Sequence, residues 1–238
     1  MTLTLNSLIK EAAALAGIHV TRLQNNPLHT FLGLRRISFK SIFDVGANEG
    51  QFARLIRRQF PRAKIYCFEP LPSAYGKLAE WAANDGNAVI AQIALSDSPG
   101  EAEINLHEEH SPSSSILSTT DKCLELYPFT ARQRKVKVLI NRLDDYAQAL
   151  PKPPEAEILL KLDVQGFEAP VLRGASNFLH KTRALIVEIC LDPLYERQST
   201  FQEAFALADQ AGLRYAGNIT QTYGTDGHVV YLDALFIR

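Results

Sequence analysis

Two glycines and an acidic residue stand together where the chemistry of this chain could begin. Asp44 precedes Gly46 and Gly50, and the spacing of the two glycines is G-x-x-x-G. Dinucleotide sites use G-x-G-x-x-G to hold a pyrophosphate at a helix N-terminus, and the middle glycine is absent here. A carboxylate at Asp44 would repel a pyrophosphate and attract a cation. The turn, with Ala47 and Asn48 inside it, therefore favours S-adenosylmethionine, a cationic nucleoside without phosphate; the alternative is an ordinary glycine turn beside a solvated carboxylate.

A second carboxylate follows the next apolar run. Glu69 stands 23 positions after Gly46 and directly before Pro70. An acidic residue about 20 positions beyond a glycine turn can accept hydrogen bonds from both hydroxyls of a ribose. The alternative is an exposed glutamate that stabilises the start of a helix through its dipole. Taken with the glycine turn, Glu69 and Pro70 are predicted to bind the nucleoside.

The third apolar run ends beside the expected position of the adenine ring. It closes with Ala94 and Leu95, followed by Ser96 and Asp97. Leu95 could pack on the ring, and Ser96 or Asp97 could accept a hydrogen bond from its amino group. The same residues also begin a strong turn sequence. Ala94 and Leu95 are therefore candidate cofactor contacts.

Charged side chains near the ends of the next two runs could carry the catalytic step. Asp163 lies where an apolar run ends, Lys161 lies inside that run, and Glu188 lies inside the following one. A buried carboxylate needs partners, and Lys161 could be one. Asp163 and Glu188 could converge on a divalent metal such as Mg²⁺, or one of them could be a general base; each could instead only stabilise a loop. We predict Asp163, Lys161 and Glu188 as catalytic residues, with Asp163 also in contact with the cofactor.

Strands that alternate with helices would bring these residues to one edge of a sheet. This order predicts an α/β fold with a doubly wound, mostly parallel sheet, in which ligands bind beyond the carboxyl ends of the strands. The last two strands are separated only by a glycine-rich turn, so the last one is expected to be antiparallel. The seven predicted strands span residues 41–45, 64–68, 88–95, 158–164, 184–190, 213–216 and 229–237. The predicted helices fall near residues 52–60, 72–82, 167–179 and 200–212.

Residues 96–140 depart from this alternation and are predicted to form an insertion with a hairpin and a mobile loop. The loop begins with His107 and His110, either of which could be a base but is more commonly solvated. Four basic residues near the end of the insertion predict a solvated edge strand or a surface that attracts an acidic acceptor. They are Arg132, Arg134, Lys135 and Lys137.

The N-terminal part of the chain is expected to be separate from this fold. Residues 1–24 have apolar side chains at helical spacing, and Gln24–Pro27 would end that helix. We therefore divide the chain into an N-terminal helical extension, residues 1–40, and a main domain, residues 41–238. The helix could cover the main domain, form a homodimer or lie on a membrane, although few basic residues support the last option.

Composition restricts the class of protein further. The chain has 238 residues, 46% of them hydrophobic, and a formal net charge of −1, so no basic field predicts nucleic-acid binding. The three cysteines form no C-x-x-C pair, which is typical of a reducing compartment. No apolar stretch is long enough to span a membrane, and the N-terminus lacks the features of a signal peptide. A cytoplasmic location is expected.

As an ordered set, these residues resemble class I S-adenosylmethionine-dependent methyltransferases, and most closely the FkbM family. The resemblance implies a Rossmann-like methyltransferase fold and O-methylation of hydroxyl groups, often on sugars, glycans or natural products. Any one segment is weakly specific, but their series over residues 41–190 is distinctive. The matching segments are residues 43–50, 68–70, 94–97, 100–102, 113–116, 143–145, 161–168 and 171–175, together with Glu188.

Methyl transfer to a hydroxyl would require Asp163 to remove a proton, either directly or by holding a metal ion with Glu188. Two alternatives stay open at this point. One is an NAD-dependent oxidoreductase on a similar sheet, against which the missing glycine and Asp44 argue. The other is an adenosylmethionine-binding module without catalytic activity.

Overall fold

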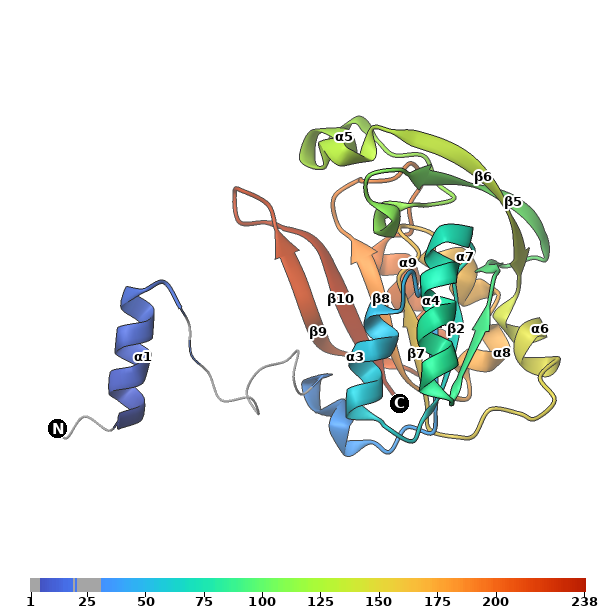
Figure 1. The fold of residues 1–238 in the computed structure, drawn as a ribbon, viewed down its shortest axis with the longest axis horizontal. Coiled ribbons are helices and arrows are strands. Elements are labelled where there is room, and N and C mark those ends of the chain that lie inside the picture. Colours follow the sequence, from blue (N-terminus) through green and yellow to red (C-terminus); the bar gives the residue numbers. More distant parts are fainter. Residues whose placement is uncertain (1–4, 19, 21–30) are drawn as a thin grey trace.

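The computed structural model describes residues 5–18, 20 and 31–238, and its centre is a seven-stranded sheet (Figure 1). The strand order is β3-β2-β1-β7-β8-β10-β9, and β10 runs antiparallel to the other six strands. The predicted doubly wound, mostly parallel sheet with an antiparallel last strand is therefore confirmed. Its strands are β1 (Ser41–Val45), β2 (Lys64–Phe68), β3 (Ala88–Ala91), β7 (Ile158–Leu162), β8 (Thr182–Cys190), β9 (Arg214–Tyr223) and β10 (Val229–Ile237).

Helices cover both faces of this sheet because successive strand residues point to opposite sides. Ile42 packs in the core that includes Ile56 and Leu78 of the helices on one face. Its neighbour Phe43 packs in the other core, with Val171 and Phe178. The first face carries α3 (Gln51–Gln59) and α4 (Pro72–Asp85), and the second carries α7 (Glu168–Arg173), α8 (Ser176–Leu179) and α9 (Phe201–Gln210).

The single helix predicted for residues 167–179 is wrong, because α7 and α8 are separate. Gly174 lies between them, where a Cβ would stand 1.9 Å from the carbonyl oxygen of Ser96. The turn after β4 therefore packs directly on the backbone at this point. α9 begins with a capping box, since Glu203 N–H donates to the Thr200 hydroxyl and the Glu203 carboxylate accepts from Thr200 N–H.

The single strand predicted for residues 88–95 is also wrong, because the chain changes sheets within it. β3 pairs with β2, whereas β4 (Ala94–Leu95) pairs with β6 in a second sheet of order β4-β6-β5. This sheet contains the predicted hairpin, β5 (Gly100–His107) with β6 (Gln133–Asn141). β6 lies between β4 and β5, but β4 pairs only with its last two residues, Ile140 and Asn141. The basic part of β6 pairs with β5 on one side and is exposed, as predicted for a solvated edge strand. Between β5 and β6 lie η3 (Ser111–Ser113), α5 (Asp121–Leu126) and η4 (Pro128–Thr130), and α6 (Leu143–Gln148) follows the hairpin.

In the N-terminal part, the structure contains α1 (Leu5–Leu15) and the 3₁₀ helix η2 (Phe31–Arg36). The helix predicted for residues 1–24 is thus shorter in the described part, and its predicted end at Gln24–Pro27 lies outside the described residues. Leu34 and Phe39 are buried in the same core as Ile42. Packing of the main domain therefore begins before β1. None of the helices in the described part of the chain has the length and apolarity needed to cross a membrane.

Gly46, at the end of β1, is required by the packing of the neighbouring strand. Its φ of +79° lies in the left-handed region, and a Cβ there would stand 1.9 Å from the carbonyl oxygen of Asp163. The carbonyl of Asp163 thus occupies the space that any side chain at position 46 would need.

Replacing Gly46 with alanine should destabilise the fold far more than the backbone angle alone requires. Gly86 has a similar φ of +73°, but no atom lies within 4 Å of the position that an alanine methyl group would take there, so Gly86→Ala is a matched control. We expect Gly86→Ala to lower the free energy of unfolding by about 1–2 kcal/mol and Gly46→Ala to lower it by at least about twice as much, measured by urea unfolding. Equal costs for the two variants would contradict the packing role of Gly46.

Candidate functional site

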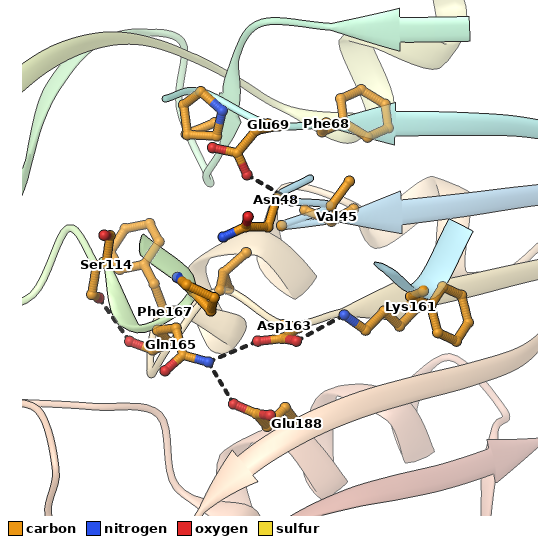
Figure 2. A pocket seen from close by; sticks show the side chains of 18 of the residues that line it. Val45, Asn48, Phe68, Glu69, Ser114, Lys161, Asp163, Gln165, Phe167 and Glu188 are labelled. Carbon is orange, nitrogen blue, oxygen red and sulfur yellow. Dashed lines mark hydrogen bonds and ion pairs between the residues drawn. The ribbon is translucent and has the colours of Figure 1, made fainter. Parts of the chain in front are cut away.

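A cavity of about 450 Å³ opens at the carboxyl ends of the central strands, where ligands bind in open α/β sheets. Its walls include the turn after β1, the end of β2, the β4 region and the end of β7 (Figure 2). All of the predicted site residues line it except Asp44 and Gly50. Those that line it are Gly46, Ala47, Asn48, Glu69, Pro70, Ala94, Leu95, Lys161, Asp163 and Glu188.

Glu69 is fixed at the wall of this cavity by two backbone hydrogen bonds. The N–H of Asn48 donates to Oε2 over 2.9 Å, and the N–H of Leu71 donates to Oε1 over 2.8 Å. Burial raises the pKa of Glu69 to about 7, although both hydrogen bonds oppose the shift. Because each carboxylate oxygen has a second lone pair, Glu69 can still accept two hydrogen bonds from a ligand.

Lys161 connects the carboxylates of two neighbouring strands. Its Nζ lies 2.9 Å from Asp163 Oδ2 and 3.8 Å from Asp44 Oδ1. Burial alone would lower the pKa of Lys161, but the two carboxylates outweigh burial and raise that pKa above its ordinary value. Burial raises the pKa of Asp44 to about 6. Asp44 is fully buried behind the cavity wall, so it contacts Lys161 rather than the cavity.

Gln165 joins the two carboxyl groups that were predicted to converge. Its Nε2 donates to Asp163 Oδ1 over 2.8 Å and to Glu188 Oε1 over 2.6 Å (Figure 2). Its Oε1 accepts a hydrogen bond from the Tyr195 hydroxyl over 2.8 Å. Burial, and then the nearby Asp163 and Asp233 carboxylates, raise the pKa of Glu188 well above its ordinary value. Glu188 is therefore harder to ionise than a free glutamate, and Asp163, which contacts Lys161 and Gln165, stays the candidate for a base.

A metal ion finds an incomplete set of ligands here. In residues 5–18, 20 and 31–238, no three His, Cys, Asp or Glu side chains come together in a way that could hold one. The Gln165 amide and the Lys161 ammonium already contact the two predicted ligands, Asp163 and Glu188. With these contacts in place, the two carboxyl groups do not fit a divalent cation. The metal site stays a prediction.

Several residues of this site were not predicted from the sequence. Gln165 has an unusual φ of +55°, and its carbonyl accepts a hydrogen bond from the Ser115 hydroxyl over 2.7 Å. Asn48 Nδ2 donates to the hydroxyl of Ser111 over 3.3 Å. The insertion thus contacts the turn after β1 and the turn after β7. Gln165 and the serine run 113–115 both fall within segments that carry the family resemblance, residues 161–168 and 113–116, but neither was predicted to have a role.

The two histidines of the insertion lie in different surroundings. His107 is buried, and burial lowers its pKa to about 4, so its ring is neutral at physiological pH. It does not line the cavity. His110 is exposed, and its Nδ1 lies 2.8 Å from the hydroxyl of Ser113.

Comparison with known proteins gives matches over this part of the chain. Residues 44–215 match the family described as "Methyltransferase FkbM domain". The chain is 30% identical over 163 residues to the 2-O-methyltransferase NoeI of Sinorhizobium fredii, covering 66% of each protein. It is 28% identical over 149 residues to the hexuronic acid methyltransferase AglP of Haloferax volcanii, covering 62% of this chain and 55% of that protein. It is also 34% identical to the methyltransferase sdnD of Sordaria araneosa, covering 57% of this chain and 60% of the other.

Among solved structures, a methyltransferase FkbM from Methylobacillus flagellatus has a TM-score of 0.54 and 12% identity. The match covers 84% of this chain and 44% of that one. At this identity the likeness supports the fold alone. The chain spans about two thirds or less of the length of these relatives.

The buried carboxyl groups predict an unusual pH dependence of stability. The pKa of Glu168, whose carboxylate accepts N–H bonds from Val164 and Gly166, is raised by burial to about 7, like that of Glu69. An acid whose pKa is raised by folding stabilises the protein fully below its unfolded pKa of about 4.5, and this stabilisation is lost as the pH rises through 7. Between pH 5 and pH 8, the free energy of unfolding of Glu168→Gln should therefore rise by roughly 1–3 kcal/mol relative to that of the native chain, measured by urea unfolding. A constant difference over this range would contradict the shift at Glu168.

Proposed function

The chain belongs to the FkbM methyltransferase family, and on this premise we propose that it transfers the methyl group of S-adenosylmethionine to a hydroxyl group of a sugar, glycan or natural product. The observation that carries the proposal is the buried Glu69 carboxylate, which is held by two backbone N–H groups at the wall of a cavity that also contains Asp163. The bound nucleoside and the general base Asp163 would then lie in the same cavity.

The chemistry of the cavity fits a cationic nucleoside. Four carboxyl groups line it, those of Glu69, Asp163, Glu188 and Asp233. Lys161 is the only Lys or Arg among the described lining residues, and two carboxylates already surround it. A dinucleotide with its pyrophosphate would find no free cation among these lining residues. This donor set supports S-adenosylmethionine and argues against the NAD-dependent alternative.

The protein's own residues would perform the remaining work of the reaction. When bound, S-adenosylmethionine supplies a methyl group activated by a sulfonium, and the loss of that methyl leaves a neutral thioether. Asp163 would accept the proton of the acceptor hydroxyl as the new carbon–oxygen bond forms. Lys161 and Gln165 hold the two oxygens of this carboxylate in one orientation, which favours the aligned displacement. We infer direct base catalysis by Asp163, because its surroundings do not fit a metal ion.

The names of two relatives each support one part of this acceptor. NoeI is a 2-O-methyltransferase, which supports transfer to oxygen, and AglP is a hexuronic acid methyltransferase, which supports a sugar as substrate. A binding module without turnover is the competing proposal. It predicts donor binding in calorimetry without methyl transfer to any acceptor.

Two further proposals concern the surroundings of the protein. All three cysteines, Cys67, Cys123 and Cys190, are buried and free, which supports the cytoplasm as its location. Ile9 and Leu15 of α1 are exposed, which supports a homodimer formed through the N-terminal helix. Residues 1–40 would then serve assembly, and residues 41–238 would carry the methyltransferase activity.

The Glu69→Gln variant tests donor binding. A glutamine has one acceptor oxygen, so its amide group would face one of the two N–H groups that the carboxylate now accepts. We expect the donor Kd, measured by calorimetry with S-adenosylmethionine, to rise at least about tenfold. Glu49→Gln is the control, since Glu49 is a nearby, partly exposed residue that does not line the cavity. Unchanged donor affinity in Glu69→Gln would refute the proposed ribose contact.

The Asp163→Asn variant tests the base. An amide keeps the size of the side chain but cannot take the proton, so kcat should fall by about 10²–10⁴-fold. The measurement is acceptor-dependent release of S-adenosylhomocysteine as a function of pH, with thermal unfolding to verify the fold. A native kcat and an unaltered pH profile in Asp163→Asn would contradict the role.

A further inference from the structure

A second cavity, of about 340 Å³, adjoins the first at the proposed base. Four residues line both cavities: Pro112, Asp163, Gln165 and Glu188. Ligands that occupy the two spaces would therefore meet at Asp163. Since the first cavity carries the predicted nucleoside contacts, the second is the space left for an acceptor.

The walls of the second cavity are the insertion and the loop between β8 and α9. Their backbones are hydrogen-bonded, because the N–H of Thr120 donates to the Leu194 carbonyl over 3.0 Å and the N–H of Glu196 donates to the Ser118 carbonyl over 2.8 Å. The Tyr195 hydroxyl lies 2.9 Å from the Ser113 carbonyl. Figure 1 shows the insertion, with α5, over the end of the sheet where β8 terminates. These contacts give the second cavity a defined shape.

The lining of the second cavity combines aromatic rings with polar groups. Tyr127 and Phe129 lie on the insertion, with ring centroids 5.8 Å apart, and the His110 ring lies 4.9 Å from Phe129. Phe129 is 37% exposed, so its ring is open to a ligand. Gln165 and Glu188 add an amide and a carboxyl group to the same lining.

The second cavity has no cation to receive an anionic acceptor. No Lys or Arg occurs among its lining residues in the part of the chain that the structure describes. Three residues of the predicted basic cluster lie near carboxylates of the insertion. Arg132 and Arg134 lie 3.2 and 3.9 Å from Glu108, and Lys135 lies 2.9 Å from Glu103. Attraction of an acidic acceptor by this cluster stays a prediction, and none of its residues lines the second cavity.

We propose that the second cavity binds the acceptor as an uncharged sugar ring, with its C–H face on Tyr127 and Phe129 and one hydroxyl directed at Asp163. This inference rests on the proposed methyl transfer and specifies its substrate class. A pyranose has an apolar face and polar edges, which match a lining that holds both aromatic rings and polar groups. A flat phenol would offer fewer hydroxyl groups to those polar groups, and a uronate would bring its carboxylate into a cavity whose described lining has no Lys or Arg.

Binding to the full chain in the presence of S-adenosylhomocysteine tests the substrate class without requiring turnover. The probes are methyl glucoside, methyl galactoside and methyl mannoside, with methyl glucuronoside and catechol as competitors, and the measurement is saturation-transfer NMR titration. We expect at least one neutral glycoside to bind about tenfold or more tightly than either competitor. Phe129→Ala should weaken that binding about tenfold, the effect of losing one aromatic contact of this kind.

Tyr223→Ala is the matched control, because Tyr223 is an exposed aromatic residue that lines neither cavity. It should leave glycoside binding within about twofold of the native value. Tighter binding of catechol or the glucuronoside, or an unchanged affinity in Phe129→Ala, would overturn the inference. If S-adenosylmethionine binds but no neutral glycoside does, the inference is wrong and the donor site stands. If S-adenosylmethionine itself does not bind, the proposed function fails first.

Discussion

The contact between β1 and β7 is the constraint on which the site depends. The two strands pair in parallel with Asp44 opposite Lys161, and the Gly46 backbone rests against the Asp163 carbonyl just beyond them. This is also the place where the strand order reverses, since β2 and β3 lie to one side and β8 to the other. Loops leave in opposite directions at such a point and open a crevice between them. The proposed donor turn and the proposed base are therefore neighbours through backbone packing, before any ligand binds.

Burial of charge is the cost of this arrangement. Asp44, Glu69, Glu168 and Glu188 all have pKa values raised by burial, so the protein alone holds carboxyl groups that resist ionisation. Lys161, the one Lys or Arg among the described residues that line the cavity, opposes this shift at Asp44 and Glu188. A bound cation would favour the ionised forms of the carboxyl groups that face it. Donor binding and the ionisation of Glu69 are thus expected to support each other through the same electrostatic interaction.

The sequence was sufficient for the parts of the fold that depend on local pattern. β1 and β2 have their predicted bounds, because short β-branched and aromatic runs between turn residues have few alternatives. The errors occur where distant segments decide the structure. The turn after β4 packs on Gly174 and divides a helix that the apolar periodicity of residues 167–179 would continue. The chain between β3 and β4 moves to another sheet, because β6, about 45 residues later, supplies the partner of β4.

The same distinction explains which site residues could be found. Glu69 and Asp163 follow strands, so the rule that ligands bind beyond strand ends was enough to identify them. Gln165 was missed because its importance comes from three contacts with residues far away in the chain: Glu188, Tyr195 and Ser115. No local pattern distinguishes such a residue from an ordinary turn residue. The sheet carries the residues proposed for donor binding and base catalysis, whereas Ser113 and Ser115 of the insertion contact Tyr195 and Gln165 and so help to form the second cavity. Under the proposed function, a change in the insertion would alter the acceptor space and leave the proposed donor contacts on the sheet in place.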